Sequence, residues 1–132
     1  MSTLTHLTEY VWQSAEYPVC TVDVPVGVLA ERFGIPLAHW EEPGLGDASG
    51  FGCRLASGLV LFLEELFHAR EHLGAKGPTI YVEATELVER GIQSTLASTL
   101  AGLDLSPQSV TWSQTEAGLQ AAREISHRHN GA

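Results

Sequence analysis

The residues that come closest to a catalytic motif are His68, Glu71 and His72, which form the pattern H-x-x-E-H in the segment HAREH. Two histidines at positions i and i+4 share one helix face and can bind Zn²⁺, and the glutamate between them can act as a general base. This spacing is that of the inverted zincin signature. The third zinc ligand of such enzymes is a distant downstream carboxylate, and no acid in this chain has that spacing. We therefore expect a polar helical turn at residues 68–72 and no bound metal, with a metal-dependent hydrolase as the alternative.

The other residues with chemical potential do not form a catalytic pattern. Cys20 and Cys53 are not arranged as C-x-x-C, and both lie in apolar, strand-like segments, which predicts buried free thiols. The glycines between residues 44 and 52 precede a strand rather than a helix, which argues against a phosphate-binding loop. Ser57 lies in A-S-G rather than G-x-S-x-G and is typical of a turn. We expect no catalytic residue, no cofactor and no enzyme activity.

Clusters of carboxylates, one of them beside a tryptophan, are the candidate binding residues. Tryptophan is enriched at binding hot spots, and loops carry binding residues more often than cores do. We predict that a partner binds at Trp40, Glu41, Glu42, Asp47, Glu64, Glu65, Glu71, Glu83 and Glu86. A paired-carboxylate hydrolase would need two such acids to face one cleft with separated pKa values. The alternatives are a solvated acidic face and a tryptophan that anchors the core.

The charge of the chain limits the class of partner. Sixteen acidic residues against seven basic ones give a formal net charge of −9. A negative protein is repelled by phosphate backbones and by anionic lipid surfaces, so we expect neither a nucleic-acid nor a membrane partner. The same charge can steer a basic protein into place, or it can serve solubility alone.

Hydrophobic alternation predicts strands at residues 18–24, 51–55, 59–66, 79–84 and 109–113. The segment ASG at residues 56–58 predicts a tight turn, which makes a hairpin of the strands on either side. Residues 59–66 are almost wholly apolar, which is typical of a central strand covered on both faces. Residues 41–52 contain Pro43 and several glycines, and we expect a loop there that leads into a strand.

Helices are predicted at residues 26–33, 86–101 and 116–127. Thr85 is the expected N-cap of the second helix. Its apolar residues fall four apart and should lie on the sheet: Val88, Ile92, Leu96 and Leu100. The order of elements predicts an α+β fold, in which a single layer of mixed, mostly antiparallel sheet has helices packed on one face.

Length and composition predict one globular domain. A chain of 132 residues with 44% hydrophobic residues can bury a core without disulfides or metal. We expect residues 128–132 to be frayed. The N-terminal residues show neither a basic nor an apolar signal region, and no apolar run is long enough to span a membrane. These features predict a soluble, cytoplasmic protein.

Two segments carry a resemblance to a known group of proteins. Residues 52–59 (GCRLASGL) lead into an apolar strand, and residues 78–84 (PTIYVEA) lead into a helix. In these features, and in size and acidity, the chain resembles small bacterial immunity proteins of polymorphic toxin systems, including contact-dependent inhibition and secreted-effector systems. The resemblance implies binding of a cognate toxin domain, with its active site or substrate access blocked, and it implies no catalytic residue.

Three functional hypotheses follow. The first is an immunity or inhibitor protein that binds a basic toxin domain. The second is the metal-dependent hydrolase built on His68, Glu71 and His72. The third is a self-associating adaptor, in which the apolar strand at residues 59–63 pairs at a sheet edge. A monomer or a homodimer is compatible with the sequence.

Overall fold

The computed structural model describes residues 4–9, 12, 14–67, 77–115 and 117 of the chain. Its strands are β1 (Leu4–Leu7), β2 (Glu16–Val22), β3 (Ala38–Glu42), β4 (Gly46–Leu55), β5 (Val60–Leu66), β6 (Thr79–Glu83) and β7 (Val110–Ser113). Its helices are α1 (Val26–Arg32), α3 (Ala84–Arg90) and α4 (Ile92–Gly102), with a 3-10 turn, η1 (Pro107–Ser109), before β7. The predicted turn at residues 68–72 and nearly all of the predicted helix at residues 116–127 lie outside the described residues.

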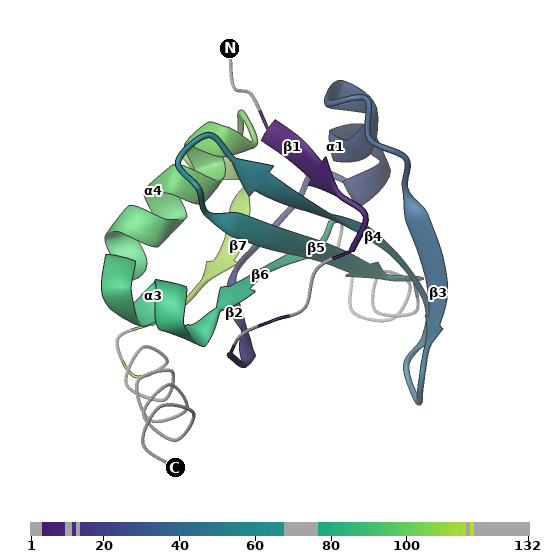
Figure 1. The fold of residues 1–132 in the computed structure, drawn as a ribbon. Coiled ribbons are helices and arrows are strands. Elements are labelled where there is room, and N and C mark those ends of the chain that lie inside the picture. Colours follow the sequence, from purple (N-terminus) through teal and green to yellow (C-terminus); the bar gives the residue numbers. More distant parts are fainter. Residues whose placement is uncertain (1–3, 10–11, 13, 68–76, 116, 118–132) are drawn as a thin grey trace.

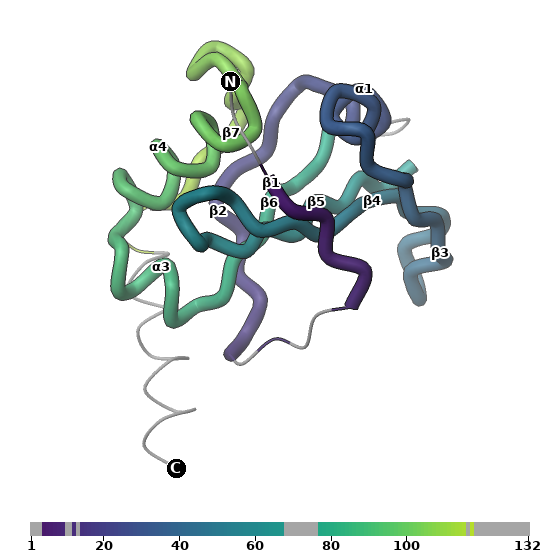
Figure 2. The backbone as a smooth tube through the Cα atoms, turned by 45° about the horizontal axis from the view of Figure 1, so that its top comes forward, coloured from purple at the N-terminus to yellow at the C-terminus, as the bar shows by residue number. Residues whose placement is uncertain are grey.

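The strands form one sheet with the order β1-β4-β5-β6-β2-β7, and β3 also pairs with β4. Every pairing among the described strands is antiparallel. The long strand β4 pairs with β3 along residues 46–50 and with β1 along residues 52–55, so β3 and β1 follow one another along the same edge of β4 (Figure 2). The predicted α+β fold with a mostly antiparallel sheet is confirmed.

The helices cover one face of this sheet. The α3–α4 pair lies at the end formed by β6, β2 and β7, and α1 lies near β4 and β5 (Figure 1). Between helices and sheet lies one hydrophobic core, to which the helices contribute Leu29 and Leu87 and the central strands contribute Leu61, Leu63 and Ile80. Burial of each such side chain contributes about 1.5–3 kcal/mol to folding. No helix in the described ranges is long and apolar enough to cross a membrane.

The predicted helix at residues 86–101 is in fact two helices. Gly91 separates α3 from α4, and its φ of 82° lies in the left-handed region that favours glycine. The first helix begins at Ala84, so Thr85 is not its N-cap. The Thr85 N–H donates instead to the Ser14 hydroxyl at 3.3 Å, which satisfies one of the free N–H groups of the first turn.

The segment expected to be a loop at residues 41–52 forms a hairpin. Glu42 ends β3 and Gly46 begins β4, and the strands are joined by a short turn with Gly44 at a φ of 77°. The Leu45 N–H donates to the Glu42 carbonyl oxygen at 2.9 Å and closes that turn. Glycine and proline predicted a loop here, but Pro43 and Gly44 serve only the turn, and cross-strand pairing orders the rest.

Candidate functional site

One face of the sheet carries none of the helices in the described part of the chain. Residues that pair directly across antiparallel strands point to the same face. The register therefore places one row of residues across β4, β5, β6 and β2 on this open face: Gly52, Phe62, Tyr81 and Pro18. Their neighbours along β5 and β6 are buried beneath the helices. The predicted central position of residues 59–66 is confirmed, but burial along β5 alternates, so the second face of the strand is covered only in part.

Aromatic rings line this open face. The Phe62 ring lies 5.8 Å from the Trp40 ring and 6.5 Å from the Tyr81 ring, centroid to centroid, in the tilted arrangements that aromatic pairs favour. Trp40 lies over Gly50, where an added Cβ would come within 2.9 Å of the indole Cη2. The missing side chain at Gly50 therefore lets the indole approach β4.

Three carboxylates, which we call the carboxylate cluster (Glu16, Glu42 and Glu64), surround the aromatic row. The Trp40 indole N–H donates to Glu42, with 2.8 Å between Nε1 and Oε2. The Trp12 indole N–H donates in the same way to Glu16. Glu64, on β5, is hydrogen-bonded to Glu42. The cluster thus joins β2, β3 and β5, and two of its three members are held by indole groups.

The protonation of the cluster is shifted by burial and by its own negative charge. The pKa of Glu64 is raised to about 7, mainly by burial. The charge of Glu42, a hydrogen bond with Glu42 and the charge of Glu16 raise it further. Burial and the charge of Glu42 raise the pKa of Glu16, which the hydrogen bond from Trp12 opposes. Burial, followed by the charges of Glu64, Glu16 and Glu42, raises the pKa of Tyr81, with an opposing hydrogen bond from the Thr79 side chain. No basic side chain of the described part contributes to these shifts.

The hydrogen bond with Glu42 favours the protonated form of Glu64. Glycosidases hold their two carboxyl groups about 5 Å or more apart, and a directly hydrogen-bonded pair is too close for that geometry. Among the described residues, no group of three or more histidine, cysteine, aspartate or glutamate side chains could hold a metal ion. The arrangement is suited to attracting an organic cation, because it combines aromatic rings with acids that no basic side chain among the described residues neutralises.

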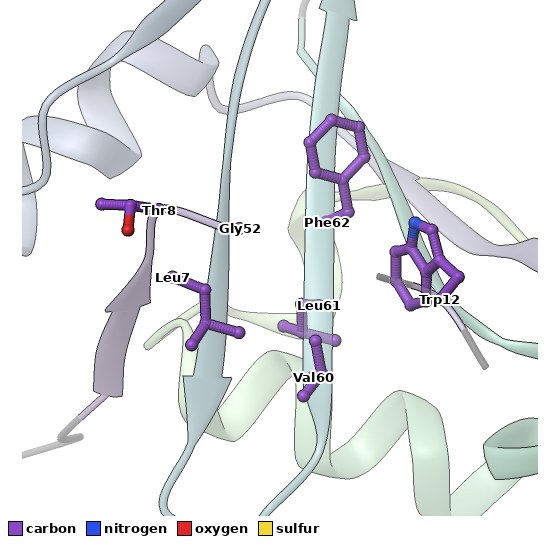
Figure 3. A pocket seen from close by; sticks show the side chains of 7 residues that line it. All are labelled: Leu7, Thr8, Trp12, Gly52, Val60, Leu61 and Phe62. Carbon is purple, nitrogen blue, oxygen red and sulfur yellow. The ribbon is translucent and has the colours of Figure 1, made fainter. Parts of the chain in front are cut away.

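Two adjoining hollows lie beside the cluster, above the backbone of Gly52. One has a volume of about 200 Å³ and the other about 330 Å³, and both are lined by Leu7, Thr8, Gly52 and Phe62. Trp12 completes the smaller hollow. Figure 3 shows Trp12 on one side of β5 and Leu7 and Thr8 on the other, with Phe62 between them. The larger hollow extends to residues 36–38, which lead into β3.

Of the predicted binding residues, the structure brings together Trp40, Glu42 and Glu64. Glu41 and Asp47 pair across the β3–β4 hairpin, where both are exposed and point away from the open face. These two predicted binding residues therefore lie on the opposite face of the sheet from Glu42 and Glu64, because neighbouring residues of a strand point to opposite faces.

The remaining predicted residues lie apart from the cluster. Glu65 points toward the helix-covered side, where its Oε1 accepts a hydrogen bond from the Val26 N–H at 2.9 Å. Glu83 is only 6% exposed at the end of β6. Glu86 forms an ion pair with Arg90 at 2.6 Å, one turn along α3. The predicted residues Glu71, His68 and His72 lie outside the described residues.

Sequence reasoning missed four residues of this face: Trp12, Glu16, Phe62 and Tyr81. Glu16 precedes the strand predicted from residue 18. Phe62 and Tyr81 were assigned to strands, but the face of the sheet on which each lies was not predicted. The signal in the sequence was Glu64, a charged residue two positions after Phe62 in a mostly apolar strand. That spacing places both on one face, which cannot be fully buried.

Self-association through a free edge at residues 59–63 is not compatible with this sheet. Strand β5 lies between β4 and β6 and pairs with both. Strand β4 pairs along residues 60–66 on one edge and β6 pairs at residues 62–64 on the other, so the strand lies inside the sheet.

Comparisons of the chain with protein-family models, with curated proteins and with solved structures found no match.

Proposed function

We propose that this chain is a binding protein of the immunity or inhibitor type, which uses its open sheet face to cover a basic region of a cognate toxin domain. The carboxylate cluster is the observation that supports this proposal best. Its three acids repel one another in a partly buried site, where the ionised form of Glu64 is disfavoured. A cation supplied by a partner would relieve that repulsion.

Within the described ranges, the three basic residues leave the cluster available to such a partner. Arg54 lies on the same face as Gly52, two residues further along β4, but it is exposed and is not among the charges that shift Glu64. Arg90 is paired with Glu86, and Arg32 donates to the carbonyl oxygens of residues 103 and 104. The net charge of −9 adds long-range attraction, which speeds association with a basic protein.

The aromatic rings supply the apolar part of the proposed interface. Trp40, Phe62 and Tyr81 are each partly exposed and lie in ring contact across three strands. Tryptophan and tyrosine are enriched among the residues that dominate binding energies, and their faces attract guanidinium and ammonium groups.

Coexpression with the toxin domain encoded beside this chain tests the proposal. We expect the wild-type chain to protect growth and the double variant Glu42→Gln/Glu64→Gln to lose protection. The matched control is Glu41→Gln/Asp47→Asn, which removes the same charge from the opposite face of the β3–β4 hairpin. Cell death in the presence of the wild-type chain, or equal protection by both double variants, would contradict the proposal.

A further inference from the structure

Neither the backbone conformation nor the packing of the fold requires a glycine at position 52. Gly52 lies within β4, and it is not among the glycines of positive φ. A Cβ added there would meet its nearest atom, the Leu7 carbonyl oxygen, at 3.6 Å, which is ordinary contact. Glycine inside a strand lowers stability by about 0.5–1 kcal/mol relative to alanine. The absence of a side chain does have one effect, because Gly52 forms the floor of both hollows.

Gly50, two residues earlier on the same face, is a useful contrast. A Cβ there would overlap the Leu63 carbonyl oxygen and would lie 2.9 Å from Trp40 Cη2. Packing therefore requires glycine at position 50, whereas position 52 could hold alanine. We infer that the open floor at Gly52 is used for binding.

We propose that the hollow over Gly52 receives an arginine side chain of the protein partner, with its methylene stem over Gly52 and against Phe62 and its guanidinium group at the carboxylate cluster. This inference rests on the proposed function and names the chemistry of the occupant.

The acids lie just beyond the lining of the hollows, and Glu64 pairs directly with the lining residue Gly50. Trp12 lines the smaller hollow, and its indole N–H is bound to Glu16. Phe62 lines both hollows and contacts Trp40, whose indole N–H is bound to Glu42. A side chain that lies in this apolar hollow and ends in a positive charge therefore complements both parts of the site.

Arginine fits this site better than lysine does. Its guanidinium group is planar, stacks on aromatic faces and donates to carboxylates in a bidentate manner. It is also more weakly hydrated than an ammonium group, so less hydration is lost in a partly buried site. The carboxylates held by Trp12 and Trp40 would accept those hydrogen bonds.

The first test titrates the ¹⁵N-labelled chain with blocked arginine (Nα-acetyl-arginine methylamide) and follows NMR signals. We expect saturable shifts at the Gly52 amide and at the Trp12 indole N–H, with a dissociation constant in the millimolar range. The blocked citrulline analogue has the same shape without the charge, and the blocked lysine analogue keeps the charge without the plane. Shifts that do not saturate, or equal binding of either analogue, would overturn the inference.

The second test uses the cognate toxin domain and fills the hollow without altering any charge. Gly52→Ala should weaken toxin binding, and Gly52→Val should weaken it more. For valine we expect a loss of affinity of about tenfold or more, and tenfold corresponds to about 1.4 kcal/mol of binding free energy. Thermal unfolding should show that both variants are at least as stable as the wild type, and the alanine variant carries the test if valine disturbs the strand.

The two proposals fail in different ways in these experiments. If the wild-type chain and Gly52→Val bind the toxin domain equally well, the hollow is not occupied and the inference is wrong, while the proposed function stands. If no toxin domain binds the wild-type chain, the proposed function is wrong. Because the inference names a toxin partner as the source of the arginine, it is then wrong too, whatever the result with blocked arginine.

Discussion

Glu64→Gln should make the protein more stable at alkaline pH, although it removes a charged residue from the surface. The pKa of Glu64 is raised from an ordinary value of 4.5 to about 7. The folded state therefore holds a proton that the unfolded state releases, and this stabilisation is full below pH 4.5 and is lost as the pH rises through about 7. At 1.36 kcal/mol per pKa unit the shift corresponds to about 3 kcal/mol, and partial solvent screening reduces our expectation to about 1–2 kcal/mol.

The assay is urea unfolding of the wild type and of Glu64→Gln at several values between pH 4.5 and pH 8. The neutral amide resembles the protonated acid, so the two proteins should differ little at pH 4.5 and most at pH 8, where the variant is the more stable. Glu41→Gln, on the opposite face of the same sheet, should not change the pH dependence. A variant that is less stable than the wild type at pH 8, or that keeps the wild-type pH dependence, would refute the electrostatic account of the cluster.

Three further predictions concern packing, a hydrogen bond at the start of α1 and the reactivity of the buried thiols. Gly50→Ala should lower the free energy of unfolding by about 1–3 kcal/mol through overpacking, whereas Gly52→Ala should raise it by about 0.5–1 kcal/mol, and urea titration of both variants measures the contrast. Glu65→Ala should destabilise the protein by about 1 kcal/mol, because it removes the acceptor of a backbone N–H at the start of α1, and thermal unfolding is the check. Burial raises the thiol pKa of Cys20 and of Cys53 to about 12, so iodoacetamide should label neither at pH 8 unless the chain is unfolded; rapid labelling of the native protein would show that the sheet opens there.

The elements that local patterns specify were predicted well. The β4–β5 hairpin follows from alternating apolar residues on both sides of a turn in which Gly58 has a φ of 91°. Strands β1 and β3 and the break between α3 and α4 were missed, because their cause is not visible in a hydrophobic pattern. The break at Gly91 depends on the conformation of one residue. Strand β3 is held by pairing with β4, a tertiary contact that overrides its weak local signal.

The candidate site was only partly predictable, because its residues converge from segments far apart in the sequence. Glu42 and Glu41 are neighbours of the same type, and only the strand register shows that Glu42 faces Trp40 and Phe62 while Glu41 does not. Glu16 comes from a strand on the far side of β6. Sequence could identify acids and a tryptophan as candidates, but their grouping depends on the order of strands in the sheet.

Two features of the open face lower the stability of the fold, and the proposed binding function would account for both. The first feature is the ionised form of Glu64, which a glutamine at that position would remove. The second is the glycine at position 52 of strand β4, which an alanine could replace. Each substitution is expected to stabilise the free protein, yet each would remove something that a basic partner needs: negative charge in one case and an open floor in the other. A purely structural surface has no reason to keep both features within one patch of β4 and β5. The Glu64→Gln and Gly52→Ala variants therefore separate the two explanations, because under the binding hypothesis the variants become more stable and bind less tightly.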